Sequence, residues 1–507
     1  MDASALLLDV HDEDSPSRRG RFGGKGIGFV ASVALTVNNI SGAGMLEFPQ
    51  MFQRAGLLPS LLSLGLVCVV SSLFATTLAD TVARVPHNKD FSRRIEFSDV
   101  FEEYIGRRTA ILTQAVFFLN LLSQNLAAIV ACAQMFDSFA GNFYPGGSYA
   151  FRLSPAPVGW VYWDPSHCGG DATSASDGPQ IGMADGMPDG GEGGMSTCVP
   201  FAAEGDAALL ISSGYVATLL LLAPLGLMTL EENMLQQKLS FGALFLLSGQ
   251  FVWTFACTGL SDGHLPWIGH HWADSLGVVI FNFAFCVTVP SWLNEKAPHV
   301  SVNTVFWTST TTATVLYTAV GVLGALAFPQ VPENMLSLML SSQVGCICIC
   351  TCICICICTW TCICICICIW TWAWTWTWTW TWPCICISGM LSLMLSSQVG
   401  LTTRLCATLF GVVIIGFGVP IFCVIMRYNL VSGGLCSEGW AHVWSSVLPW
   451  ACAWMLYQGN LVLHLLSWSG LVLNGFIDFL MPGAVTLASL GAAALVRRQV
   501  STHSPLK

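Results

Sequence analysis

Long apolar stretches alternate with short polar connections over most of the chain. A helix needs about 20 mostly apolar residues to cross the hydrocarbon core of a bilayer. Stretches of this length occur at 26–50, 57–84, 109–136, 208–230, 240–260, 274–294, 303–328, 403–426, 439–458 and 461–494. The pattern predicts an all-α polytopic membrane protein with about ten transmembrane helices, the last of them long enough to be tilted or broken.

The composition excludes a water-soluble globular protein. Hydrophobic residues make up 54% of the chain and charged residues only 9%, whereas soluble domains carry about 25% charged residues. Nothing resembles the basic, aromatic-interleaved surface of a nucleic-acid-binding protein. The first 14 residues are acidic, and the first 25 lack the apolar core of a cleavable signal peptide, so we expect the first apolar run to remain as a span.

Basic residues indicate the orientation in the membrane, because short cytoplasmic loops carry the excess of Lys and Arg. The outer loop 137–207 contains one Arg and no Lys. The N-terminal tail and the second-to-third connection are basic, with Arg18, Arg19, Arg21, Lys25, Lys89, Arg93, Arg94, Arg107 and Arg108. This asymmetry predicts a cytoplasmic N-terminus.

The spans and connections divide the chain into five predicted parts. These are a cytoplasmic tail (1–25), a first transmembrane part (26–345, with the outer loop 137–207), a low-complexity insert (346–400), a second transmembrane part (401–496) and a cytoplasmic tail (497–507). The outer loop holds two cysteines, Cys168 and Cys198. On an oxidising face we expect them to form a disulfide; the alternative is two free thiols.

The insert consists of alternating Cys-Ile and Trp-Thr dipeptides over 346–387 and holds 13 of the 23 cysteines. It lies between two copies of one 11-residue segment, 335–345 and 390–400. A metal site is disfavoured because zinc ligands usually come in separated pairs, and an exposed strand of this kind would aggregate. A translated nucleotide repeat explains both the dipeptide period and the duplication. We therefore predict no metal and interpret function without the insert.

The first span contains two glycines and two asparagines at mid-membrane depth, Asn38, Asn39, Gly42 and Gly44. Unwound backbone is tolerated there only where it lines a cavity. Broken helices of transporters bind an anionic substrate group at a half-helix N-terminus, and freed carbonyls hold a cation. Close packing through small residues is the alternative. Asn38 together with the downstream Pro49 favours a break.

These residues resemble the amino acid/auxin permease family, whose first span carries an Asn, a Gly-x-Gly-hydrophobic-Leu stretch and a Pro. The matching positions are Asn38, Gly42, Gly44, Met45, Leu46 and Pro49. Weaker similarity covers Phe281–Cys286 with Pro290, Thr408 with Pro420–Arg427, and Leu471–Pro482. Two features differ: the family commonly has an eleventh span, and the sixth span here lacks a glycine at the expected break.

The resemblance implies a five-plus-five inverted-repeat transporter fold, in which broken spans one and six meet at the midplane. Phenylalanines at every second position of the sixth span suit a partly extended segment lining a pocket; packing or lipid-facing side chains are the equal alternative. The predicted substrate-binding residues are Asn38, Ser41, Gly42, Ala43, Gly44, Met45, Phe281, Phe283 and Phe285.

Ionisable residues inside a membrane are candidates for ion coupling. Glu47 and Asp478 are the candidates for a proton, and a solvated vestibule or a capped helix break is the alternative for both. A sodium site would use Asn38, Gly42 and the Thr408 hydroxyl. The ten residues after Thr408 offer no second hydroxyl, so the sequence favours protons.

The sequence therefore predicts a cation-coupled secondary transporter (a symporter) of amino acids that works by alternating access. The alternative is a transporter-like sensor that binds an amino acid without moving it. Intramembrane ionisable residues are too scattered for a membrane enzyme, and we predict no cofactor beyond H⁺ or Na⁺. An acidic di-leucine pattern (Asp2, Leu6, Leu7) favours a vacuolar or endolysosomal membrane, and the plasma membrane is equally consistent.

Overall fold

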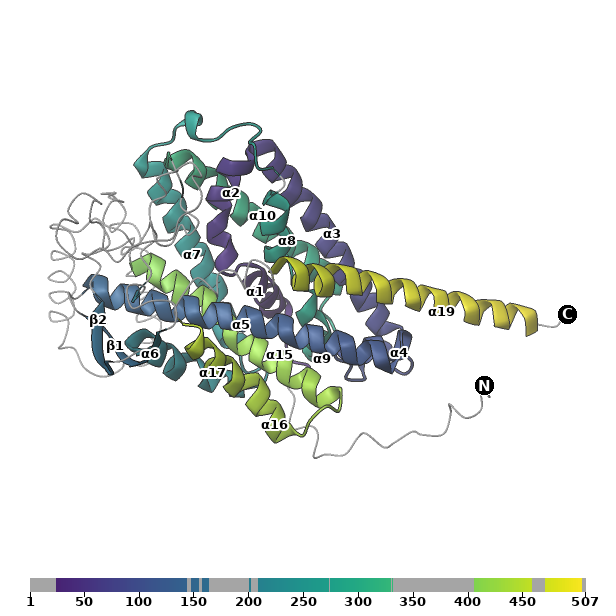
Figure 1. Cartoon of the computed structure of the whole chain (residues 1–507). Helices are drawn as coiled ribbons and strands as arrows, with labels where there is room; N and C mark the ends of the chain where they lie inside the picture. The colour runs from purple at the N-terminus through teal and green to yellow at the C-terminus, as the bar shows by residue number, and fades with distance from the viewer. Residues whose placement is uncertain are drawn as a thin grey trace, which may run out of the picture.

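Long apolar helices make up most of the molecule (Figure 1). The computed structural model describes residues 24–143, 147–154, 157–163, 200–201, 208–272, 274–329, 331, 405–457 and 470–503. The predicted Cys168–Cys198 disulfide and the insert 346–400 lie outside the described residues.

Seven helical segments among the described residues are long and apolar enough to cross a membrane. They are α3 (Leu57–Ala83), α5 (Arg107–Phe143), α7 (Met234–Thr258), α8 with α9 (Asp274–Asn282 and Val289–Glu295), α10 (Val302–Ala327), a segment ending in α15 (Gly418–Ser432), and one containing α19 (Met481–His503). A bent pair, α1 (Phe29–Ile40) with α2 (Phe48–Ala55), brings the number to eight. The chain is a multi-pass membrane protein, but the predicted count of ten is not confirmed.

Prolines shorten the helices in the other two predicted spans, because proline has no backbone N–H and fixes its φ. In the region 208–230, β3 (Leu209–Ser212) leads into α6 (Ser213–Leu222) and a 3-10 turn that begins at Pro224. In the region 439–458, three short pieces follow one another: α16 (Glu438–His442), the π-helical η9 (Val443–Val447) and α17 (Leu448–Met455), with Pro449 in the first turn of α17.

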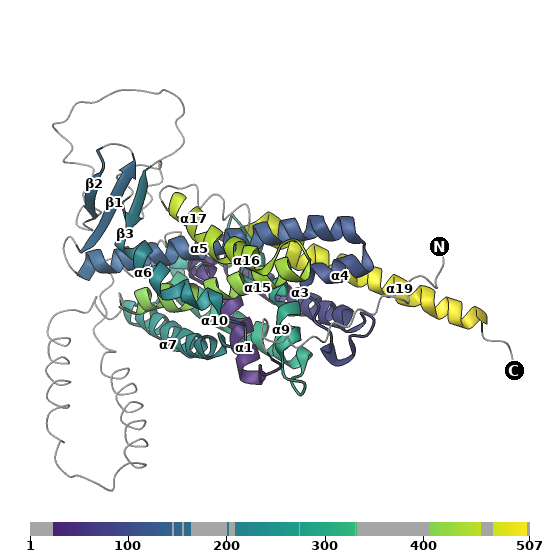
Figure 2. The same ribbon diagram turned by 90° about the horizontal axis from the view of Figure 1, so that it is seen from below.

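A three-stranded antiparallel sheet, formed by the predicted outer loop and the start of the predicted span 208–230, was not expected from the sequence. It contains β1 (Ser148–Ser154) between β2 (Gly159–Trp163) and β3. α5 runs seven residues past its predicted end at 136 and reaches the sheet (Figure 2). The Asp137 carboxylate of α5 accepts hydrogen bonds from Ser148 (2.7 Å) and from the Gly214 N–H (2.7 Å), and so ties the sheet and α6 to the bundle.

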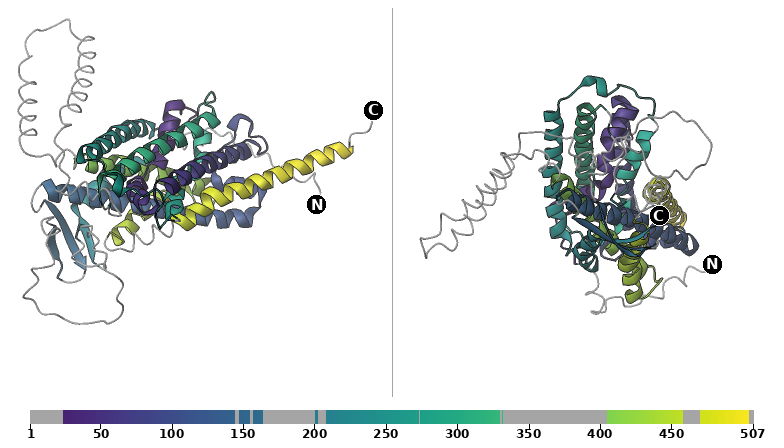
Figure 3. Two further views of the ribbon diagram at one scale, coloured as in Figure 1. Left: turned by 90° about the horizontal axis from the view of Figure 1, so that it is seen from above. Right: turned by 60° about the vertical axis from the view of Figure 1, so that its left-hand side comes forward.

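Two long helices, α10 and α5, each contact several others in the bundle. α10 packs along α1, α2, α3 and α7. Figure 3 shows the bundle from two further directions, with purple helices of the N-terminal part beside teal helices of the middle of the chain. α5 packs against α4 (Phe97–Tyr104), α6, α15 and α17. α19 contacts α3 and then extends away from the bundle, on the side opposite the sheet (Figures 1 and 2).

The short helix α4 is held to the bundle on the predicted cytoplasmic side by the carboxyl group before it. Glu96 is buried between α4, α9 and α15. It accepts hydrogen bonds from Ser291 (2.5 Å), Asn294 (2.8 Å) and Asn429 (3.4 Å). Burial raises the pKa of Glu96 to about 8, because desolvation outweighs the hydrogen bonds from Ser291 and Asn294, which favour the charged form.

Candidate functional site at two broken helices

The first span is broken where the sequence predicted it. α1 ends at Ile40, and the N–H of Ser41 donates to the Val37 carbonyl (2.7 Å). Gly42 is extended, with φ −83° and ψ −156°, and the 3-10 turn η1 (Ala43–Glu47) follows. The helical pieces on either side differ in direction by 55°. Glycine has low helix propensity and Pro49 fits only the first turn of the helix that begins there, so a continuous helix is disfavoured.

The sixth span is also broken, although it has no glycine at the break. α8 ends at Asn282, residues 283–285 are not helical, and the 3-10 turn η7 (Cys286–Thr288) leads into α9. A proline inside a helix clashes with the carbonyl four residues earlier. Pro290 therefore opposes an α-helix that includes Cys286, directly after the break.

Polar side chains satisfy the carbonyls that the second break exposes. The Ser71 hydroxyl of α3 donates to the Phe283 carbonyl (2.8 Å). The Thr288 hydroxyl donates to the Phe285 carbonyl (2.8 Å). Since an unpaired carbonyl is costly in a membrane, these contacts stabilise the irregular backbone.

The two breaks meet at Gly44 and Asn282. A Cβ atom on Gly44 would lie 2.5 Å from Nδ2 of Asn282, so only glycine fits without displacing the amide. Gly42 is different: a Cβ atom there would have no heavy atom of the described residues within 4 Å. Gly44 therefore permits the close approach of the two spans, while Gly42 faces open space.

Tyr317 of α10 contacts both breaks, and sequence reasoning did not single it out. Its hydroxyl donates to the Ile40 carbonyl at the end of α1 (2.7 Å). Its ring stacks on Phe48 with 4.3 Å between centroids and meets Phe283 edge-on at 5.7 Å. A tyrosine within a predicted span was the only available signal.

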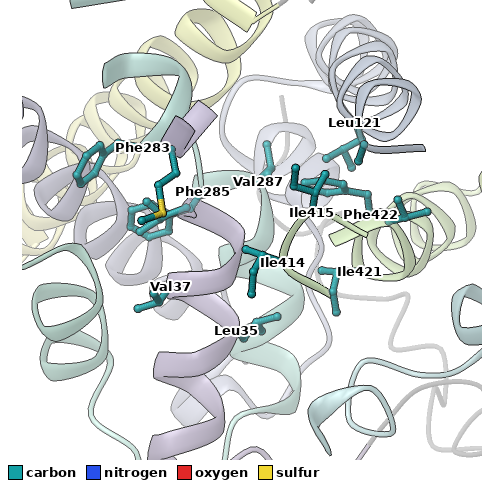
Figure 4. Packing of buried hydrophobic residues seen from close by; sticks show 14 of the residues in the cluster. Leu35, Val37, Leu121, Phe283, Phe285, Val287, Ile414, Ile415, Ile421 and Phe422 are labelled. Carbon is teal, nitrogen blue, oxygen red and sulfur yellow. The ribbon is translucent and has the colours of Figure 1, made fainter. Parts of the chain in front are cut away.

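The predicted phenylalanines differ in their surroundings. Phe283 and Phe285 are buried, and Phe285 lies 5.7 Å from Phe306 of α10 between ring centroids. Phe281 is only partly buried, in α8. Figure 4 shows Phe283 and Phe285 in the apolar cluster that also contains Val37 of α1. Packing therefore accounts for two of the three side chains, and substrate contact stays a prediction.

Around the first break, Ser41 and Met45 are buried, and Ala43 begins η1. Glu47 ends η1 and is partly exposed.

Asn38 lies on α1 facing α7. Its Nδ2 donates to the backbone carbonyl (2.8 Å) and to Oε1 (2.9 Å) of Gln237, whose own amide donates to the Phe417 carbonyl (3.1 Å). Oδ1 of Asn38 is buried without a hydrogen-bond partner among the described residues, so it is available to a cation. Gln237 was not predicted, because α7 begins at Met234 and the predicted fifth span began only at 240.

Thr408 is buried. It lies just before the π-helical segment η8 (Phe410–Ile415) of the predicted eighth span. η8 contacts η1, so the segment that follows Gly42 in span one lies beside the segment that follows Thr408 in span eight.

Asp478 lies in the π-helical segment η10 (Gly470–Leu480) and is fully buried. Its Oδ1 accepts the N–H of Val287 in η7 (3.1 Å). The carboxyl group thus caps the half-helix that restarts after the second break, which is the alternative considered from the sequence. Oδ2 has no partner among the described residues, so coupling to an ion stays a prediction.

A cavity of about 490 Å³ lies elsewhere, between the start of α1 and the start of α7. Its lining includes Gly28, Glu231, Glu232 and Lys238. None of the predicted site residues lines it, so we assign no substrate to this cavity.

Residues 25–155 match the family described as transmembrane amino acid transporter protein. No curated protein sequence matches the chain. Among solved structures, the chain is similar to Mhp1, a nucleobase-cation-symport-1 family transporter, in a closed conformation with bromovinylhydantoin bound. The two share 10% identity with a TM-score of 0.51, over 92% of this chain and 80% of that one.

At this level of identity the likeness to Mhp1 concerns the fold alone. The predicted inverted-repeat transporter fold with broken spans one and six is confirmed. This chain is a multi-pass membrane protein of transporter fold whose resemblance to the transmembrane amino acid transporter family is confirmed over residues 25–155.

Proposed function

We propose that this protein moves amino acids across a membrane as a cation-coupled secondary transporter working by alternating access, with the N-terminus in the cytoplasm. The observation that carries the proposal is the meeting of two broken helices at Gly44 and Asn282. Breaks of this kind supply helix ends and backbone carbonyls for a zwitterion and its coupling ion.

The substrate binds beside Gly42 in this proposal. Open space adjoins Gly42, and the half-helix Gly44–Ala55 starts there. The positive end of its dipole favours the carboxylate of an amino acid. The other half-helix start, at η7, already faces the Asp478 carboxyl group, which makes it a poor place for a second anion.

The coupling ion is a proton, and Asp478 carries it. The side chain is fully buried at the second break, with one oxygen bonded to Val287 and the other without a partner among the described residues. A carboxyl group placed in this way can change its charge as the break moves. Sodium at Asn38 and Thr408 is the other candidate.

Replacement of Asp478 by Asn tests the coupling, since the amide can still accept the Val287 N–H but cannot titrate. We expect D478N to lose accumulation driven by a proton gradient and to retain exchange of labelled for unlabelled amino acid in vesicles. Accumulation that follows the proton gradient unchanged in D478N would contradict the assignment. Accumulation that follows a sodium gradient instead would favour the Asn38 and Thr408 site.

A further inference from the structure

A cluster of amides lies between α5 and η10, with Asn120 and Asn474 buried and Gln124 partly buried. Nε2 of Gln124 on α5 donates to Oδ1 of Asn474 on η10 (2.6 Å). The same nitrogen lies 3.5 Å from Oδ1 of Asn120, one turn away on α5. Both asparagine oxygens are therefore turned toward one donor, which places the two amides close together.

Two amide nitrogens of this cluster, Nδ2 of Asn120 and Nδ2 of Asn474, lack a hydrogen-bond partner among the described residues, as does Oδ2 of Asp478, which lies four residues after Asn474. Their residues are 0–1% exposed. A buried polar group without a partner is costly, and more so in a membrane, where lipid cannot supply one. A small polar ligand would satisfy these atoms.

The amide cluster adjoins the carboxyl group that caps the second break. Asn474 and Asp478 lie four residues apart on η10 and are both buried, whereas Val472 and Leu480 of the same segment are 56% and 60% exposed. The two polar side chains thus share the inner face of η10. Segments of π-helix are frequent at functional sites, and this one spans 11 residues.

The chemistry of the free atoms selects the ligand. A cation needs oxygen ligands, but both asparagine oxygens face Gln124. An anion would lie near the Asp478 carboxyl group. Water can accept from the amide nitrogens and donate to the carboxyl oxygen, and buried water typically makes about three such bonds.

We propose that Asn120, Gln124 and Asn474 bind water that gives protons access to Asp478. A hydronium at this position transfers its proton to Oδ2: an O–H bond forms on the carboxyl group, one breaks on the hydronium, and water remains. The role in proton delivery rests on the proposed coupling, whereas the water site does not. The thiol of Cys286, buried beside Asp478 in η7, is the neighbouring titratable group.

Hydrogen–deuterium exchange of the Asp478 carboxyl group tests the water site without transport. Infrared difference spectra of the purified full-length protein at acidic pH, after transfer to D2O, follow its C=O band, and D478N identifies that band. We expect the double variant N120L/N474L to slow exchange at least about tenfold, the effect of a barrier higher by about 1.4 kcal/mol. Unchanged exchange in a folded double variant would overturn the proposal.

Two further variants separate a lost water site from a damaged fold. N125L removes another buried amide of α5, one that donates to the Cys423 sulfur on α15 (3.3 Å), and should leave exchange as fast as in the wild type. N474S replaces the amide by a smaller hydroxyl group, which can still bond to water and makes room for it, so this variant should also exchange rapidly. Slow exchange in N125L or N474S would count against the site.

Transport by the same variants separates this inference from the proposed function. N120L/N474L should lose proton-driven accumulation and keep amino-acid exchange. If the wild type transports without proton coupling while the exchange results are as expected, the water site stands and the coupling is wrong. If proton-driven accumulation is normal in N120L/N474L, the delivery role is wrong and the proposed function stands.

Discussion

Two glycines at the first break have different surroundings: one permits close contact with another span, and the other adjoins open space. Gly44 and Gly42 belong to one sequence motif and were predicted to act together. The structure separates them, because only Gly44 lies against Asn282. This difference depends on a residue 238 positions away in the sequence, so no local pattern could have shown it.

Substitution of the two glycines by alanine should therefore have unequal effects. G44A forces the Asn282 amide to move and should destabilise the protein by about 1–3 kcal/mol, the usual cost of overpacking. G42A has room for the added methyl group and should unfold at nearly the temperature of the wild type. Thermal unfolding of the purified variants in detergent measures this difference. Equal destabilisation in both variants would show that the contact with Asn282 is unimportant.

Glu96 should make stability depend on pH. Its pKa is raised from 4.5 to about 8 in the folded protein, so the folded state holds a proton that the unfolded state has lost in this range. The contribution of Glu96 to the free energy of unfolding is fully present below about pH 4.5 and is lost as the pH rises toward 8. Burial also raises the pKa of Asp99, which adds a dependence of the same sign.

The unfolding temperature of E96Q in detergent should fall less steeply between pH 5 and pH 8 than that of the wild type, since glutamine cannot titrate. Identical slopes for E96Q and the wild type would mean that Glu96 is ionised in the folded protein throughout.

At the scale of elements, the sequence predicted the first break better than the second. Gly42, Gly44 and Pro49 disfavour a helix locally, so their pattern was sufficient. The second break has no glycine and was predicted from the family resemblance and the phenylalanine spacing. Ser71, Tyr317 and Asp478, which hold the breaks in place, come from other spans, and such contacts depend on tertiary packing.

The outer sheet was missed for a related reason. Its strands are short and separated along the chain, with β1 and β2 in one region and β3 directly before α6. Leu209–Ser212 is apolar and continuous with α6, so hydropathy alone assigned it to a span. The segment Leu209–Ser212 is distinguished as a strand only by its pairing with β1, in which Phe151 lies opposite both Trp160 and Ile211.

The hydroxyl of Tyr317 should contribute both to the stability of the protein and to uptake, because it joins α10 to the first break. Y317F removes the hydrogen bond to Ile40 and should cost about 0.5–1.5 kcal/mol of stability. We also expect slower uptake, since the end of α1 loses its attachment. Y215F removes a similar buried bond, to the Trp450 carbonyl (2.8 Å), far along the sequence from either break. It should lower the unfolding temperature to a similar extent without slowing uptake; equal slowing would reduce Tyr317 to a general stabilising role.

At the scale of the whole molecule, the transporter fold accommodates a segment that we predict has no part in function. Removal of 346–400 joins Gly345 directly to Leu401 and retains one copy of the duplicated segment. The shortened protein should reach the membrane and take up amino acids at the rate of the full chain. A second, longer deletion removes residues 335–345 together with the insert and serves as the control for the length of chain removed. Loss of uptake on removing 346–400 alone would show that the insert contributes to transport.

The central claim is that the two breaks carry an amino acid across the membrane. Uptake of a panel of labelled amino acids into vesicles containing the purified protein tests it most directly, with and without a proton gradient. We predict accumulation of at least one amino acid above its external concentration, only with an inward proton gradient, and its loss in G44A. Saturable binding without accumulation under any gradient would contradict transport and identify a sensor.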